Sequence, residues 1–409
     1  MAAGDLFECL AAGKYAGMSG SASRLFFPFH PLDAIRSLMI SDGVATEIPA
    51  AGLDVLSPED ELLWCCARVS PSPEAVETIR QRARGPLDWD RVFQLSWWHR
   101  IRPLTYRHLC EHAPDQIPAP IVERFIEQTS ELSDRGRRLV AGLHDVAAIF
   151  EQAKTRLLFF KGPALAIDAY GDVGLRECGD LDLLLHRDDF PQAASLLKSH
   201  GFRSAWERPP SEALRQVFAC EFDRRGVQLD VHWDLAPGWL RYRVDFDSFW
   251  EAGVPISSGG HYARKMRPED LLIVLCVHGA KHWWERLRWI ADIAELVNRG
   301  QIRDWDRVAA ASDRAHSRRS VQLGLWLAHR LLDADIPPSV AERWVQDKRT
   351  QRLGMHVVRW LGQAEQAAAS RNLRERFSFR MGLCERWRDR APQIWHYLRE
   401  RPSRRSAGE

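Results

Sequence analysis

Apolar residues recur at helical spacing through the first part of the chain, up to about residue 152. Ser57 followed by Pro58 is typical of a helix start, because serine caps the first turn and proline fits its first position. Asp88 opens another predicted helix, and residues 132–150 have the 3.6-residue spacing of a third. Residues 1–55 are weakly patterned, so we expect them to form a loosely ordered extension.

The pattern changes near residue 155. Residues 157–160 form a short apolar run that ends at Lys161-Gly162-Pro163, which predicts a buried strand, a glycine turn and a helix start. Residues 181–185 predict a second strand, and residues 227–233 alternate apolar with polar positions, as a half-buried strand does. Strands and helices therefore mix within residues 153–265, which indicates a small sheet packed with helices.

Helical spacing returns at Arg267-Pro268, and Gly300 is a natural stop for the apolar stretch 271–299. The pentapeptide at 304–308 repeats the one at 88–92 letter for letter. It marks either a duplicated unit or a favoured helix opening with Asp as N-cap, and we favour the second. The pattern thus predicts an α+β fold: an extension (1–55), a helical region (56–152), a sheet-containing core (153–265), a helical domain (266–400) and a basic tail (401–409).

Composition narrows the function only slightly. The net charge of +2 gives the whole chain no strong preference for nucleic acid or membrane. Residues 371–409 are rich in Arg and aromatic residues, a composition that can contact nucleic acid or anionic lipid, although a terminal helix with a solvated Arg face is favoured. The eight cysteines have no metal-binding spacing, no secretory signal or long apolar run is present, and the expected location is the cytoplasm.

Two aspartates carry the clearest chemistry. Asp180 and Asp182 are two apart, so in a strand both side chains project from the same face, while Leu181 and Leu183 face the core. Adjacent carboxylates repel unless a cation neutralises them, and Mg²⁺, with Mn²⁺ as an alternative, suits such oxygen ligands. A lone Asp-x-Asp is more often a turn or a solvated edge.

A third carboxylate strengthens the interpretation. Asp230 shares the polar face of the strand 227–233 with Gln228 and His232. If this strand lies beside the first, Asp180, Asp182 and Asp230 converge on one spot, an arrangement that fits two-metal phosphoryl or nucleotidyl transfer. Asp230 could then complete the metal site or accept the proton of an attacking hydroxyl.

Basic residues supply a candidate phosphate site. Gly162 sits between a strand and a helix, where backbone N–H groups can hold a phosphate, with Lys161 and Arg176 adding positive charge. Lys281 and His282 are candidates for contacts with nucleotide phosphate or acceptor. His278 and His282 have a metal-binding spacing, but no third ligand is apparent and zinc is not favoured. Asp292 could orient a basic neighbour.

These residues resemble the polymerase-beta-type nucleotidyltransferase superfamily, and more closely the bacterial family of uncharacterised nucleotidyltransferases. The resemblance covers roughly residues 57–340. The matching stretches are Phe160–Gly162, Tyr170–Gly171, Arg176, Gly179–Leu184, Leu229–Trp233, His278–Trp283 and Leu287–Asp292, with Asp88–Trp89, His99–Arg100 and Pro103–Leu104 upstream. One departure is Pro163, where the superfamily usually has Ser or a second Gly, so one N–H that could meet a phosphate is missing.

The resemblance implies a polymerase-beta-like core flanked by helical regions, with Asp180 and Asp182 as metal ligands and Asp230 as the third carboxylate. The implied activity is Mg²⁺-dependent transfer of a nucleoside monophosphate (NMP) from a nucleoside triphosphate (NTP), for example ATP, to an unidentified hydroxyl acceptor on a small molecule, peptide or protein. Nucleic acid is a less favoured acceptor. The alternatives are a non-catalytic nucleotide- or partner-binding module and a phosphotransferase that moves the γ-phosphate.

Overall fold

A computed structural model of the chain describes residues 56–256, 260–362 and 373–400, all of which fall within one compact unit. The predicted extension (1–55) and basic tail (401–409) lie outside the described residues. No helix in the described residues is long and apolar enough to cross a membrane. The cysteines within those residues are free, and most of them are buried.

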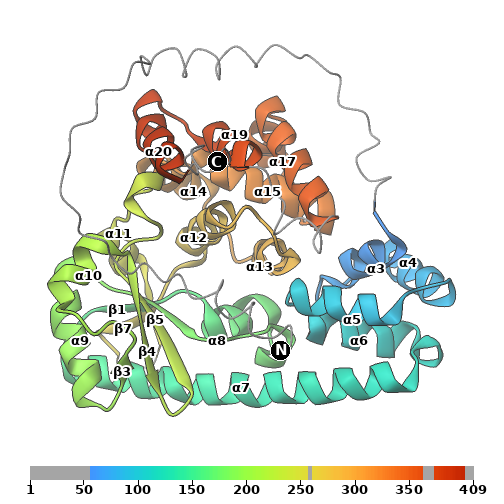
Figure 1. Cartoon of the computed structure of the whole chain (residues 1–409), viewed down its shortest axis with the longest axis horizontal. Helices are drawn as coiled ribbons and strands as arrows, with labels where there is room; N and C mark the ends of the chain where they lie inside the picture. The colour runs from blue at the N-terminus through green and yellow to red at the C-terminus, as the bar shows by residue number, and fades with distance from the viewer. Residues whose placement is uncertain (1–55, 257–259, 363–372, 401–409) are drawn as a thin grey trace, which may run out of the picture. The chain divides into compact units, whose positions relative to one another are not determined.

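The N-terminal helices begin where the capping residues predict. The Ser57 hydroxyl accepts a hydrogen bond from Asp60 N, and the Asp60 carboxylate accepts one from Ser57 N, which forms a complete capping box. Asp88 caps the next predicted helix through Arg91 N. The helices are α3 (Pro58–Cys66), α4 (Pro73–Arg84), α5 (Trp89–Trp98), α6 (Arg102–His112) and α7 (Ala119–Gln152). Helix α7 is the longest and runs past both the other N-terminal helices and the sheet (Figure 1).

A seven-stranded mixed sheet follows, in the order β3-β4-β5-β2-β1-β7-β6. At its centre β2 runs parallel to β5 and antiparallel to β1. The strands are β1 (Leu157–Phe159), β2 (Leu181–Leu184), β3 (Arg203–Ser204), β4 (Ala219–Arg224), β5 (Val227–His232), β6 (Val254–Pro255) and β7 (Ala263–Lys265), with helices α8 (Gly162–Leu165), α9 (Phe190–Ser199), α10 (Pro210–Gln216) and α11 (Phe246–Ala252) between them.

Both faces of the central strands are buried. Leu181 and Leu183 of β2 belong to one apolar cluster with α7 and α9, while Leu184 belongs to a second cluster with the N- and C-terminal helices. Helix α7 approaches β5 closely at Gly142, where a Cβ atom would lie 2.6 Å from Val227 Cγ1. The observed mixture of helices and a mixed sheet confirms the predicted α+β class.

The C-terminal part is helical. Its helices are α12 (Pro268–Lys281), α13 (Leu287–Asn298), α14 (Trp305–Arg314), α15 (Arg318–Leu332), α16 (Pro338–Val340), α17 (Lys348–Leu361), α19 (Leu373–Leu383) and α20 (Trp387–Glu400). The stretch 271–299 contains two helices, because Trp283 and Trp284 take left-handed φ values of 54° and 56° and turn the chain. Asp304 caps α14 through Arg307 N, as Asp88 caps α5, which confirms the repeated pentapeptide as a helix opening.

Candidate functional site

The predicted glycine turn lies directly against the acidic strand. Gly162 has a φ of +60°, and a Cβ atom on it would lie 2.6 Å from the carbonyl oxygen of Asp180. The turn begins as β1 ends, so it places Lys161 beside β2, the neighbouring strand. Glycine is required here for two reasons: the left-handed backbone and the close approach of Asp180.

Asp182 and Asp230 are direct partners across two parallel strands. Their positions pair in the register of β2 and β5, so both side chains leave the sheet on the same side. Asp182 is buried and Asp230 is partly buried. Asp180 lies in the bend just before β2, where burial, and then the charges of the nearby Asp182 and Asp230, raise its pKa. The structure therefore brings the three predicted carboxylates together.

His232 completes the acidic cluster. Its Nε2 lies 2.8 Å from Asp230 Oδ2 and 3.8 Å from Asp182 Oδ1. One ligand atom from each of Asp182, Asp230 and His232 lies within 4.8 Å of the others, a spacing that can hold a metal ion. Asp180 is not part of this tightest group.

Basic side chains face the carboxylates from the turn after β1 and from α12. Lys161 Nζ lies 2.7 Å from Asp182 Oδ1 and 3.4 Å from His278 Nδ1. Lys281 Nζ lies over the Phe218 ring at 4.6 Å from its centroid, with Leu235 O at 3.5 Å. The His278 and His282 rings contact each other at a tilt of 57°, with centroids 4.7 Å apart.

The charges of these groups perturb one another strongly. Burial raises the pKa of Asp180 to about 6, and the negative charge of Asp182 adds to the rise. Burial would also raise the pKa of Asp230, but the charge and hydrogen bond of His232 outweigh it and lower that pKa to about 2. Burial, and then the charge of Lys161, lower the pKa of Lys281 to about 8. The cluster is thus a buried set of opposed charges.

Arg176 points elsewhere. Its guanidinium is buried and donates two hydrogen bonds to Asp292, from Nε at 2.7 Å and Nη2 at 2.9 Å. Tyr170 Oη donates a third to the same carboxylate at 2.8 Å. The prediction that Asp292 orients a basic neighbour is confirmed. The geometry gives Arg176 no free donor pair for a phosphate, because Asp292 already occupies the fork of its guanidinium.

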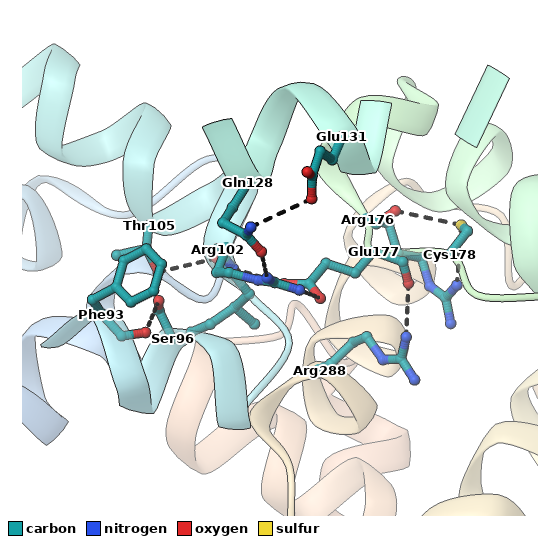
Figure 2. A network of polar contacts seen from close by, with 11 residues as sticks. Phe93, Ser96, Arg102, Thr105, Gln128, Glu131, Arg176, Glu177, Cys178 and Arg288 are labelled. Carbon is teal, nitrogen blue, oxygen red and sulfur yellow. Dashed lines mark hydrogen bonds and ion pairs between the residues drawn. The ribbon is translucent and has the colours of Figure 1, made fainter. Parts of the chain in front are cut away.

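Arginines from α6 and α13 hold the loop that leads into the acidic strand (Figure 2), and an arginine from α7 joins them. Arg102 of α6 donates to both carboxylate oxygens of buried Glu177, at 2.9 and 2.7 Å. Arg288 of α13 donates to the Glu177 carbonyl at 2.7 Å, and Arg135 of α7 donates to the Gly179 carbonyl at 2.8 Å. This clamp fixes the backbone that carries Asp180.

Several site residues were not predicted. His232 shares its strand face with Asp230, and that alternation was the signal that could have identified it. His278 lies one helical turn before His282, yet nothing local indicated that it would meet Lys161. Arg288 reaches the loop from a helix more than a hundred residues later, so no local pattern could have shown its role.

The donor set fits a hard divalent cation. Two carboxylates at paired strand positions, with Asp180 just before β2, offer the oxygen ligands that Mg²⁺ prefers. Lys161 provides a positive charge beside them. His232 adds a nitrogen ligand that Mn²⁺ accepts more readily than Mg²⁺.

A comparison with protein families finds one match. The family described as uncharacterised nucleotidyltransferase matches residues 85–333, which is more than half of the chain and contains the whole acidic cluster. No curated protein matches the sequence, and no solved structure matches the fold.

Proposed function

Since the chain belongs to the uncharacterised nucleotidyltransferase family, we propose that it transfers an NMP from an NTP to a hydroxyl acceptor with the help of a divalent cation. The observation that carries this proposal is the direct pairing of Asp182 with Asp230 across β2 and β5. Two carboxylates placed side by side on neighbouring strands repel each other, and such perturbed acidic groups gather at functional sites.

The carboxylates would hold the cation. The proposed ligands for Mg²⁺, or for Mn²⁺ as the alternative, are Asp182, Asp230 and Asp180. A bound divalent cation supplies Lewis-acid stabilisation of the charge that develops on the phosphate oxygens. His232 fixes the orientation of Asp230 through its 2.8 Å hydrogen bond.

The basic residues would hold the triphosphate and the acceptor. Lys161 lies beside the acids and, with the Gly162 backbone, is the proposed triphosphate contact. Lys281 and His282 on α12 are proposed to contact phosphate or acceptor. Arg176, bound by Asp292, is proposed to hold the loop in place. Because Pro163 offers no N–H, more of the triphosphate contact falls to Lys161.

The proposed reaction is a displacement at the α-phosphorus. The acceptor oxygen forms a bond to that phosphorus, the bond to the bridging α–β oxygen breaks, and pyrophosphate leaves. The hydroxyl proton passes to a carboxylate of the cluster. Asp230, which lies directly opposite Asp182 in the sheet, is the proposed acceptor of that proton.

Labelled nucleotides test the proposal. The full chain is incubated with each of the four NTPs carrying an α-phosphate label, with Mg²⁺ or Mn²⁺ and a cell extract as acceptor source. We expect label transfer and pyrophosphate release that vanish in Asp182→Asn and persist in Asp223→Asn, a matched aspartate on β4 of the same sheet. Transfer of a γ-label instead would identify a phosphotransferase and contradict the proposal.

One observation favours a second function. Lys161 already neutralises Asp182, so the fold does not depend on a cation, and the same arrangement could persist in a nucleotide-binding module without turnover. Equilibrium binding distinguishes the two. Saturable NTP binding with no transfer of either label, under every NTP and cation, would identify the binding module.

A further inference from the structure

Three potential metal ligands lie together on α6, among the N-terminal helices and away from β5 (Figure 1). His108, Glu111 and His112 are spaced three and four residues apart, so their side chains share one face of the helix. One ligand atom from each lies within 4.8 Å of the others. The family resemblance and the acidic cluster account for none of the three.

The His108 ring is fixed in the form that a metal ligand needs. Its Nε2 lies 2.7 Å from the backbone carbonyl oxygen of Arg68. A carbonyl only accepts, so Nε2 carries the proton and Nδ1 carries a lone pair. That Nδ1 is buried and meets no hydrogen-bond donor in the described part of the chain.

An unsatisfied buried acceptor calls for a physical reason. Most buried polar atoms find a hydrogen-bond partner, and one left unpaired destabilises the fold. A histidine that donates one ring N–H to a backbone carbonyl while its other nitrogen stays open is the arrangement by which proteins orient a metal-binding imidazole. The Arg68 residue that supplies this carbonyl is itself held in place, because its guanidinium donates a hydrogen bond to Leu331 O at 3.0 Å.

The other two ligands connect His108 to solvent. The His112 ring is parallel to that of His108, with centroids 5.7 Å apart, and it is only partly buried. The Glu111 side chain is 56% exposed, and its Oε1 lies 4.0 Å from His112 Nε2. An ion can therefore enter from water, and small rotations of Glu111 and His112 complete its coordination.

We propose that His108, Glu111 and His112 bind a divalent transition metal, with zinc as the ion that this donor set favours. Two imidazole nitrogens and one carboxylate oxygen suit zinc, whereas Mg²⁺ prefers oxygen ligands alone. Three protein ligands leave a fourth position for water. The site is independent of the proposed nucleotidyl transfer, because the two sites share no residue.

Zinc titration against a chromogenic chelator tests the site in the full chain, with excess Mg²⁺ present to occupy the acidic cluster. Each protein is also measured in the Asp182→Asn background, so that zinc at the acidic cluster is not counted. We expect one zinc ion per chain that is lost in His112→Gln and weakened about tenfold or more in Glu111→Gln. His144→Gln, an exposed histidine on α7, is the matched control and should bind as the wild type does.

Circular dichroism confirms that each variant is folded. Titrations of His112→Gln and Glu111→Gln that match the wild type would overturn the proposal. So would the absence of zinc binding by the folded wild-type chain. If His112 serves only to interact with the helix dipole at the end of α6, the folded wild-type chain should bind no zinc. Neither result bears on the transfer of labelled NMP, so the two proposals fail separately.

Discussion

The Lys161 ammonium lies 2.7 Å from a carboxylate oxygen of Asp182, in the position where a cation is needed. Lys161 therefore competes with a divalent cation for Asp182. Lys161→Met removes the competitor, so we expect Mn²⁺ to bind about tenfold more tightly, equivalent to about 1.4 kcal/mol. The same change should weaken NTP binding about tenfold or more, because the triphosphate loses its nearest positive charge. Equilibrium dialysis measures the cation, and fluorescent-nucleotide titration measures the NTP.

Lys265→Met is the control for this prediction. Lys265 also forms an ion pair on the same sheet, with Asp168 at 2.7 Å, but outside the acidic cluster. It should leave both affinities unchanged. If Lys161→Met weakens cation binding, Lys161 supports the metal site instead of competing for it.

The raised pKa of Asp180 predicts a pH-dependent stability. In the folded chain this pKa is about 6, against 3.8 for an ordinary aspartate, because burial and then Asp182 disfavour the charge. Between these values the folded state binds more protons than the unfolded state. The free energy of unfolding therefore falls as the pH rises from about 4 to about 6. Asp230 has the opposite sign, and its contribution changes only below pH 4, since its pKa is lowered to about 2.

Asp180→Asn should remove this loss of stability. We expect the variant to be about 1–3 kcal/mol more stable than the wild type at pH 7.5 without divalent cations, and equal to it near pH 4. Urea denaturation at pH 4.5, 6 and 7.5 in EDTA measures the difference. Asp223→Asn on β4 should show no such trend with pH. A stability gain for Asp180→Asn that is the same at every pH would contradict the assignment.

The sequence predicted the central strands because their signal is local. The apolar run at 157–160 and the alternation at 227–233 correspond to β1 and β5, and the phase of the latter placed Asp230 on the polar face. The pairing of Asp182 with Asp230 needed one further assumption, that the two strands are neighbours, and the register bears it out. The strands β6 and β7 are two and three residues long, too short for a periodic signal.

Contacts between distant segments could not be predicted. Arg176 looked like a phosphate ligand because it precedes the acids in sequence, yet Asp292, from a helix more than a hundred residues away, binds it. The turn at Trp283 and Trp284 could not be predicted from the local sequence for a related reason. Tryptophan has no preference for left-handed backbone, so only the surrounding packing, in which Trp284 is fully buried, holds the chain in that form.

The buried pair of Arg102 and Glu177 predicts a large cost when one partner is removed. Arg102→Ala leaves the Glu177 carboxylate buried without its two-pronged donor, so we expect a loss of about 3–5 kcal/mol in the free energy of unfolding. The double variant Arg102→Met/Glu177→Met should recover most of this loss, because no charge stays unpaired. Urea denaturation measures both.

An exposed pair is the control for this prediction. Arg203→Ala breaks the contact with Asp223, in which the Arg203 side chain is 87% exposed, and should change stability by no more than about 0.5 kcal/mol. Because Glu177 lies just before Asp180, folded Arg102→Ala protein should also transfer NMP more slowly than Arg203→Ala. Equal stability losses in the two single variants would show that burial of the Glu177 pair has no energetic effect.

A comparison of Gly162 with Gly226 distinguishes the cost of backbone strain from the cost of a steric clash. Both have left-handed φ values, +60° and +78°, but a Cβ on Gly226 meets nothing within 4 Å, whereas one on Gly162 would lie 2.6 Å from the Asp180 carbonyl oxygen. Gly226→Ala should cost about 1 kcal/mol from strain alone. Gly162→Ala adds a clash with backbone that cannot rotate away, so we expect a further loss of about 1–3 kcal/mol and displacement of Asp180. Urea denaturation gives the stability of each variant, and the labelled-NTP assay should show transfer kept in Gly226→Ala and reduced at least tenfold in Gly162→Ala. Equal behaviour of the two variants would mean that the glycine turn does not set the position of the acidic strand.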